Sequence, residues 1–397
     1  MTATIRRLGA IRQEILVVLF SGIGGISGYL FNLLVARLFG PVLLGRLLAG
    51  LGAGSCAALP AALLVLPVAR WTAQTADWRQ RLPLIQAGAI GVGCLAAFGT
   101  LLFGIEGHVL RSVPNAMWIP LSLWVVPGYL SQINVGVLMG RRAYTAMVIS
   151  SAAPLFAKLM FILPARVLGP NDMSAAWAVA TANWIGVGVG AWITYRAPRT
   201  FDAIAPPSST WPSAWVGAMS STWLTLDVTI SSLILPPASL AIYATAATLG
   251  KTPYYLVGSL VNMGMGESAW RNGRPWVIRS MIIAVGSMCV AGGLVFGQGI
   301  LRLFGLHHGV IPLIIFMIAL TVFSWGYFEA GVAAQRGQHA WIPLGLALPV
   351  WAFLGLITHP QLIELCLELA TILTIGSVIT YYLSRVHHGS SDAHELT

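Results

Sequence analysis

The chain has 397 residues, of which 57% are hydrophobic and only 9% are charged. Soluble globular proteins carry about 25% charged residues, so this composition excludes a soluble body of this size. The net charge of +10 arises mostly from arginines and lysines in short loops between apolar runs. We therefore interpret this charge as a sign of membrane topology and predict no binding of nucleic acid.

Apolar runs of the length needed to cross a bilayer, about 20 residues each, follow one another along the whole chain. The first half contains Ile15–Leu38, Leu47–Val68, Leu84–Ile105, Ala116–Met139, Tyr144–Leu163 and Ala175–Tyr195. The second half contains Trp215–Leu235, Leu240–Val261, Val277–Ile300, Val310–Ala334, Trp341–Ile357 and Leu362–Leu383. The sequence thus predicts an all-α, polytopic membrane protein with about twelve transmembrane helices.

A linker at the midpoint divides these predicted spans into two groups of equal size. Residues 201–213 contain Pro206-Pro207-Ser208-Ser209, which predicts a cytoplasmic linker between bundles at 1–200 and 214–397. The pattern Gly136-Val137 with Arg141 recurs as Gly331-Val332 with Arg336, 195 residues later. Such a shift indicates a parallel repeat, and two similar six-helix halves are typical of V-shaped transporters with the substrate path between them.

The loop charges predict the orientation of the chain. If the N-terminus is cytoplasmic, most arginines fall in cytoplasmic loops, in accordance with the positive-inside rule. The basic segment Met1–Glu14 runs into the first apolar stretch, which is too long for a signal peptide and predicts an uncleaved first helix. We therefore expect a multi-pass protein of the cytoplasmic membrane with both termini cytoplasmic.

Two lysines lie deep within predicted spans, where a charge is expensive unless it faces a cavity or a partner. Lys158 and Lys251 predict a cationic cavity between the halves that could hold a phosphate. Arg37 and Arg46 could extend this positive lining toward the outer mouth. The alternative is that these two arginines only extend to the membrane interface.

Two carboxylates also lie deep within predicted spans. Asp227 is interpreted either as a proton or cation site or as the counter-charge of Lys251. Glu329 aligns with Asn134 under the shift of 195, which indicates that both halves place a polar group at the same level. Asp227 and Glu329 are therefore the candidates for coupling to a proton or sodium ion.

Features of an enzyme or of a metalloprotein are not predicted. No nucleophile, base and acid occur together, and no loop is long enough to form a catalytic domain. The four cysteines lie singly in apolar runs, and the histidines show no ligand spacing. We expect no catalytic residue, no cofactor and no resident metal.

A motif at the end of the first predicted span resembles a known family. The run from Asn32 to Pro41, with Ala36, Arg37 and Gly40, is followed by Gly45. It resembles the N-x-x-x-A-R-x-L/F-G-P-x-x-x-G pattern of polysaccharide and O-antigen flippases, which belong to the multidrug/oligosaccharidyl-lipid/polysaccharide exporter superfamily.

The second half agrees with this resemblance, with two departures. Leu226-Asp227, Pro236-Pro237 and the run from Ile242 to Ala246 are similar to the family's L/I-D, L-G-P and G-x-Y-x-x-A elements. Ala241 and Pro236 stand where the pattern has glycine.

The resemblance implies a transporter that flips a lipid-linked oligosaccharide or polysaccharide precursor by alternating access. Asn32, Arg37 and Asp227 are the positions that match the family motif. The implied partners are the lipid-linked oligosaccharide, membrane lipids and a coupling cation. The alternative is a drug or cation antiporter of the same superfamily, whose cavity would be lined by carboxylates.

Overall fold

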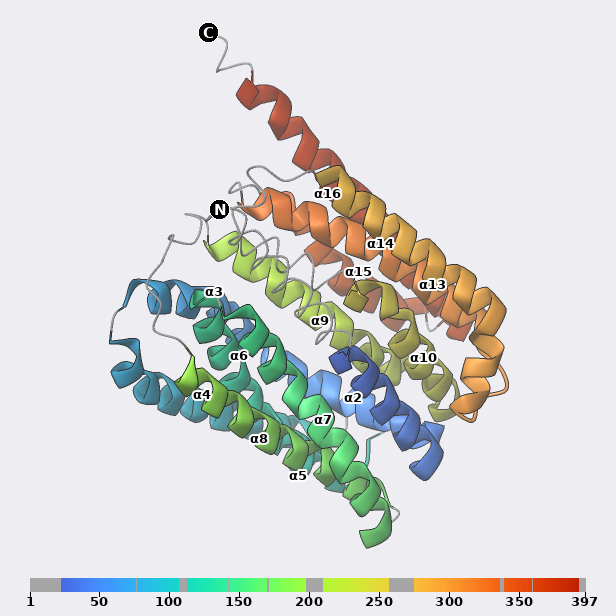
Figure 1. Ribbon diagram of the computed structural model, residues 1–397. Coiled ribbons are helices and arrows are strands. Elements are labelled where there is room, and N and C mark those ends of the chain that lie inside the picture. The colour runs from blue at the N-terminus through green and yellow to red at the C-terminus, as the bar shows by residue number, and fades with distance from the viewer. Residues whose placement is uncertain are drawn as a thin grey trace, which may run out of the picture. The chain divides into compact units, whose positions relative to one another are not determined.

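The computed structural model describes residues 23–75, 77–106, 113–141, 143–169, 171–197, 210–256, 275–335, 339–358 and 360–392. The regular elements within these ranges are helices (Figure 1). The chain divides into two compact units, Met1–Pro206 and Pro207–Thr397. The boundary falls within the predicted linker, 201–213, of which residues 201–209 lie outside the described ranges. The linker was predicted to extend too far, because a helix already begins at Thr210.

Unit 1 begins with a helix described over Ile23–Phe39. The helices that follow it are α2 (Pro41–Ala57), α3 (Leu59–Gln74), α4 (Trp78–Glu106), the short η1 (Asn115–Met117), α5 (Trp118–Leu123), α6 (Val125–Gly140), α7 (Tyr144–Leu168) and α8 (Asp172–Arg196). In this unit α6 contacts α3, α4, α7 and α8. The core of the unit therefore lies around α6, where Trp78, Leu82 and Val137 are fully buried.

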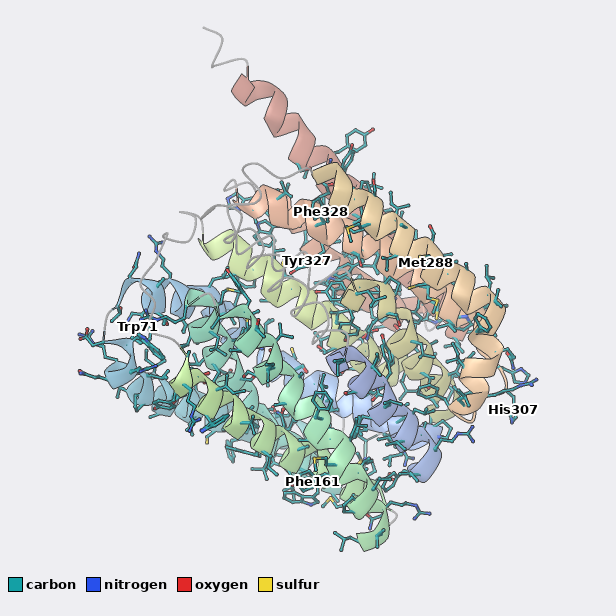
Figure 2. All side chains as sticks on the ribbon, viewed as in Figure 1. Trp71, Phe161, Met288, His307, Tyr327 and Phe328 are labelled. Carbon is teal, nitrogen blue, oxygen red and sulfur yellow. The ribbon has the colours of Figure 1, made fainter. Side chains whose placement is uncertain are left out.

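Unit 2 is built around α14. Its helices are α9 (Thr210–Ile234), α10 (Pro237–Gly250), α13 (Pro275–Leu303), α14 (Val310–Gln335), α15 (Ile342–Thr358) and α16 (Leu362–Asp392). Helix α14 contacts α9, α10, α13, α15 and α16. Its Tyr327 and Phe328, labelled in Figure 2, are buried. In each unit, one helix thus contacts most of the other described helices.

The described helices account for part of the predicted transmembrane count. Seven are long and apolar enough to cross a membrane, or eight if the bent pair α2 and α3 forms one span. Apolar side chains such as Leu168 and Met288 are 88% and 74% exposed, which suits a lipid-facing surface (Figure 2). The protein is a multi-pass membrane protein. The total of about twelve stays a prediction, because parts of Ile15–Leu38 and Leu240–Val261 lie outside the described residues.

Prolines set the start of the second helix in each unit, which the sequence analysis placed too late. Helix α2 begins at Pro41 and not at Leu47, and α10 begins at Pro237 and not at Leu240. Proline is favoured in the first helical turn because its missing N–H would have no partner there. Gly40, with φ of 98°, allows the chain to turn before α2.

The same helices also break where a continuous span was predicted. Helices α2 and α3 bend by 50° at Ala58, just before Pro60. The Ala57 carbonyl at this break accepts a hydrogen bond from the Tyr129 hydroxyl of α6, at 2.9 Å. Helix α10 ends at Gly250. Pro253 has no backbone N–H to donate to the Leu249 carbonyl, and the Thr252 hydroxyl donates a hydrogen bond to that carbonyl instead. Side-chain hydroxyls therefore stabilise both breaks.

Glycines let α7 and α8 pack closely in unit 1. Gly186 and Gly190 lie one turn apart on α8, in the small-xxx-small spacing of tightly packed membrane helices. A Cβ atom at Gly186 would collide with the backbone of Pro154 on α7, and one at Gly190 would collide with the Ser150 hydroxyl. The backbones approach so closely at Gly186 that no side chain fits there.

We expect Gly186→Leu to destabilise unit 1 by about 1–3 kcal/mol or more, because the added side chain overpacks a contact with backbone. The measurement is the unfolding temperature of the purified protein in detergent. Gly188→Leu is the matched control, since a Cβ atom at Gly188 meets nothing within 4 Å. Equal unfolding temperatures for the two variants would contradict the close packing of α7 and α8.

Candidate functional site

A buried ion pair joins α9 and α10 in unit 2. The Lys251 ammonium lies 2.9 Å from Asp227 Oδ1 and donates a second hydrogen bond to the Leu224 carbonyl, at 2.7 Å. Asp227 is 3% and Lys251 is 5% exposed. Of the two alternatives left open for Asp227, the structure contains the pairing with Lys251. The predicted roles of Lys251 in substrate binding and of Asp227 in ion coupling stay predictions.

The helix break places Lys251 for this contact. Lys251 is the residue directly after α10, and its backbone N–H still bonds the Ala247 carbonyl, at 3.1 Å. Residues 252–256 then form a new helical segment. A lysine at such a break can extend toward α9 without passing its own helix. The sequence signal for this break is Gly250 followed by Pro253.

A second ion pair joins α13 and α14. Arg279 Nε and Nη2 lie 2.6 Å and 3.0 Å from the two carboxylate oxygens of Glu329. Glu329 is only 1% exposed. Arg279 lies in the first turns of α13, within the predicted span Val277–Ile300, and the sequence did not indicate its pairing with Glu329. The coupling role of Glu329 stays a prediction, and its carboxylate is already bonded on both oxygens.

The position in unit 1 that aligns with Glu329 makes a neutral version of the same contact. Asn134 is fully buried on α6, and its Oδ1 accepts a hydrogen bond from Gln86 Nε2 on α4, at 3.2 Å. The shift of 195 that relates Asn134 to Glu329 also relates Asn32 to Asp227. At both levels an amide in unit 1 therefore corresponds to a carboxylate in unit 2, which supports the internal repeat.

Lys158 lies on α7 and faces the first helix of unit 1. Its ammonium is 5.8 Å from the centre of the Phe31 ring, within the range of a cation–π contact. Lys158 is half-buried, and among the described residues no carboxylate oxygen lies within 4.0 Å of it. Asn32, next to Phe31, is also half-buried. The motif and the deep lysine of unit 1 are thus close to each other.

The predicted arginines of the outer mouth lie in exposed surroundings. Arg46 Nη1 bonds Asp172 Oδ2 at 3.0 Å, and both side chains are about one-third exposed. Arg37 is exposed at the end of the first helix. Lys158, Arg37 and Arg46 belong to unit 1, whereas Lys251 belongs to unit 2. A shared cationic cavity of the two lysines stays a prediction.

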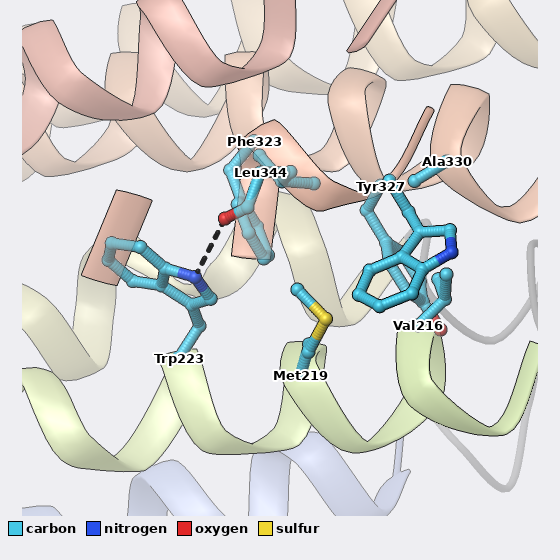
Figure 3. Close-up of a pocket in the computed structure, with 8 residues that line it drawn as sticks. Val216, Met219, Trp223, Phe323, Tyr327, Ala330 and Leu344 are labelled. Atoms are coloured by element: carbon cyan, nitrogen blue, oxygen red, sulfur yellow. Dashed lines mark hydrogen bonds between the residues drawn. The ribbon is translucent and has the colours of Figure 1, made fainter. Parts of the chain in front are cut away.

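Sequence reasoning missed an aromatic cavity inside unit 2 (Figure 3). It has a volume of about 10 Å³, roughly the space of one water molecule. Trp223 donates from its indole nitrogen to the Leu344 carbonyl, at 3.2 Å. The rings of Phe323 and Tyr327 stack with 9° between their planes. The spacing of Phe323 and Tyr327 places both rings on one face of α14, but the sequence does not show that α9 and α15 meet them there.

The described part of the chain contains no cluster of metal-ligating side chains. No group of three or more His, Cys, Asp and Glu side chains there could hold a metal ion. Among the described residues, unit 2 contains two ion pairs with a buried carboxylate and an aromatic cavity, and unit 1 contains Lys158, which has no carboxylate partner there.

The fold is similar to that of helical membrane transporters of known structure. More closely, the chain has the fold of the MATE transporters of the MOP superfamily, which solved structures match over nearly the whole chain. No protein-family model matches the sequence, and no curated protein is similar enough to match it.

Three solved structures illustrate this similarity. An inward-facing multidrug resistance MATE transporter has a TM-score of 0.55 and 14% identity, with 92% of this chain and 98% of that chain covered. A Vibrio cholerae MATE transporter in the bent form has a TM-score of 0.51 and 13% identity, with 96% of this chain and 98% of that chain covered. A MOP superfamily transporter from Pyrococcus furiosus has a TM-score of 0.51 and 15% identity, with 94% of this chain and 95% of that chain covered. That protein is described by the reverse polarity of its binding pocket.

Proposed function

We propose that this protein flips a lipid-linked oligosaccharide or polysaccharide precursor across the cytoplasmic membrane, with Lys158 meeting the phosphate of the substrate. The observation that carries the proposal is the pairing of the buried charges. Asp227 and Glu329 are each bonded to a cationic side chain, whereas Lys158 has no carboxylate partner among the described residues. Of the charges singled out deep within predicted spans, Lys158 is therefore the one that no described carboxylate neutralises.

An ammonium group in a membrane protein needs a partner, because its transfer from water is costly. The Phe31 ring supplies only part of this stabilisation to Lys158. A phosphate oxygen would supply a charge-assisted hydrogen bond, and the flexible lysine stem allows the ammonium to follow the phosphate as it moves. The carrier of the substrate would remain in the lipid while its charged group crosses along the protein.

The remaining candidates enter the proposal with narrower roles. Asn32 could hydrogen-bond a sugar hydroxyl beside Lys158, and Arg37 and Arg46 could attract the anion from the surface. Lys251 could bind substrate only after its ammonium leaves Asp227. A coupling proton or sodium ion could bind Asp227 or Glu329 only after the ion pair there opens. The two halves would alternate between inward-open and outward-open states, with both termini on the cytoplasmic side.

The test is translocation of a fluorescent polyprenyl-diphosphate oligosaccharide in vesicles that contain the purified protein. We expect the label in the outer leaflet to exchange with the inner leaflet faster than in protein-free vesicles. A neutral polyprenyl glycoside of the same sugar is the matched substrate, and it should cross at the background rate. Equal rates for both substrates, or no rate above background, would overturn the proposal.

A drug or cation antiporter is the second candidate, because two carboxylates, those of Asp227 and Glu329, are buried in unit 2. A cationic cargo or a coupling cation could bind such a carboxylate once its ion pair opens. The same vesicles, loaded with a fluorescent cationic dye and given a proton or sodium gradient, distinguish the two functions. Gradient-driven movement of the dye, without movement of the diphosphate lipid, would favour the antiporter.

A further inference from the structure

The position of the Lys251 ammonium is that of a bound ion. It contacts one carboxylate oxygen of Asp227 and one backbone carbonyl, that of Leu224, at 2.9 Å and 2.7 Å. Oxygens from a carboxylate and a backbone carbonyl thus hold a single positive charge in the interior of unit 2.

This set of oxygens has the chemistry of a site for a small monovalent cation. Hard cations prefer carboxylate and carbonyl oxygens, and transporters often bind sodium where a helix is interrupted. Helix α10 is interrupted at Lys251 itself, so the partial negative charge of its C-terminal carbonyls also lies nearby. The oxygens around the ammonium are of the kind that bind cations, and the cation they hold is the side chain of Lys251.

We propose that Lys251 is a tethered counter-ion that fills a monovalent-cation site formed by Asp227 and the Leu224 carbonyl, and that removal of the ammonium opens this site to a free ion. Because the ammonium is attached to the chain, it competes with dissolved cations for Asp227 without a loss of translational freedom. While the ion pair is closed, as in this structure, the site therefore takes up no free ion. This inference is independent of the transported substrate.

The test measures cation binding through the unfolding temperature of the purified protein in detergent, with sodium chloride compared against choline chloride at equal ionic strength. We expect Lys251→Ala to be stabilised by sodium by at least about 3 °C, since a ligand that binds only the folded state raises its stability. The wild type should show no sodium-specific shift. Asp227→Asn combined with Lys251→Ala should show none either, because the carboxylate that holds the ion is gone.

A second variant covers the case in which Lys251→Ala does not fold. Lys251→Gln keeps a donor for Asp227 but carries no charge, and we expect a smaller sodium-specific shift with it. A sodium shift in the wild type that disappears in Asp227→Asn would overturn the proposal, because the site would already exchange an ion. Absence of the shift in both Lys251 variants would also overturn it. Neither outcome bears on translocation of the diphosphate lipid, which is measured separately.

Discussion

Replacing Lys158 with alanine is expected to lower the rate of diphosphate-lipid translocation by about 10-fold to 100-fold. A hydrogen bond to a charged group contributes about 1.5–3 kcal/mol, and each 1.4 kcal/mol corresponds to a factor of ten. The loss follows because, among the described residues, no other unpaired ammonium group lies beside the motif of the first helix. The measurement is the initial rate of leaflet exchange in vesicles with equal amounts of inserted protein.

Two variants on α7 make this result specific to the charge. Lys158→Arg should keep most of the rate, because the guanidinium also binds phosphate. Met160→Ala removes a side chain that is 75% exposed two residues away and should leave the rate unchanged. A rate for Lys158→Ala equal to that of Met160→Ala would show that the ammonium does not meet the substrate.

Replacing Arg279 with methionine should destabilise unit 2 by about 2–4 kcal/mol. The variant leaves the Glu329 carboxylate, which is 1% exposed, without a cation, and breaking a buried pair in this way is costly. The cost should lie below that of a fully buried pair, because the Arg279 side chain is 23% exposed and water can reach it. The measurement is the unfolding temperature in detergent, with the proportion of folded protein followed by circular dichroism.

A double variant tests whether the charge of Glu329 causes this loss. Arg279→Met combined with Glu329→Gln removes both charges and approaches the neutral contact of Gln86 with Asn134 in unit 1. We expect it to recover most of the lost stability, since replacing both members of a buried pair is often nearly neutral. Recovery of none of it would assign the loss to packing of the arginine stem.

The sequence predicted the helical membrane architecture well because hydropathy reports burial in lipid directly. It was less successful for the starts and breaks of helices, which depend on the chemistry of the backbone. Pro41 and Pro237 begin their helices several residues before the apolar runs suggested. The break at Ala58 lies within an apolar stretch, where hydropathy cannot distinguish a straight helix from a bent one.

For the candidate site, depth was predictable and partners were not. Lys251, Asp227 and Glu329 were selected because charges are rare within apolar runs, and Asp227 and Glu329 are indeed buried beside cations. Arg279 lay within the predicted span Val277–Ile300, but nothing in the sequence identified it as the partner of Glu329. The aromatic cavity depends on three helices meeting, α9, α14 and α15, and such a contact has no local sequence signal.

The two ion pairs of unit 2 have a consequence for electrical behaviour. A membrane voltage of 100 mV acts on one elementary charge with about 2.3 kcal/mol, but a lysine and an aspartate that move together carry no net charge through the field. Movement of either ion pair as a unit therefore adds nothing to the voltage dependence of transport. The ammonium of Lys158, which has no carboxylate partner among the described residues, and the charge on the cargo would respond to the resting potential.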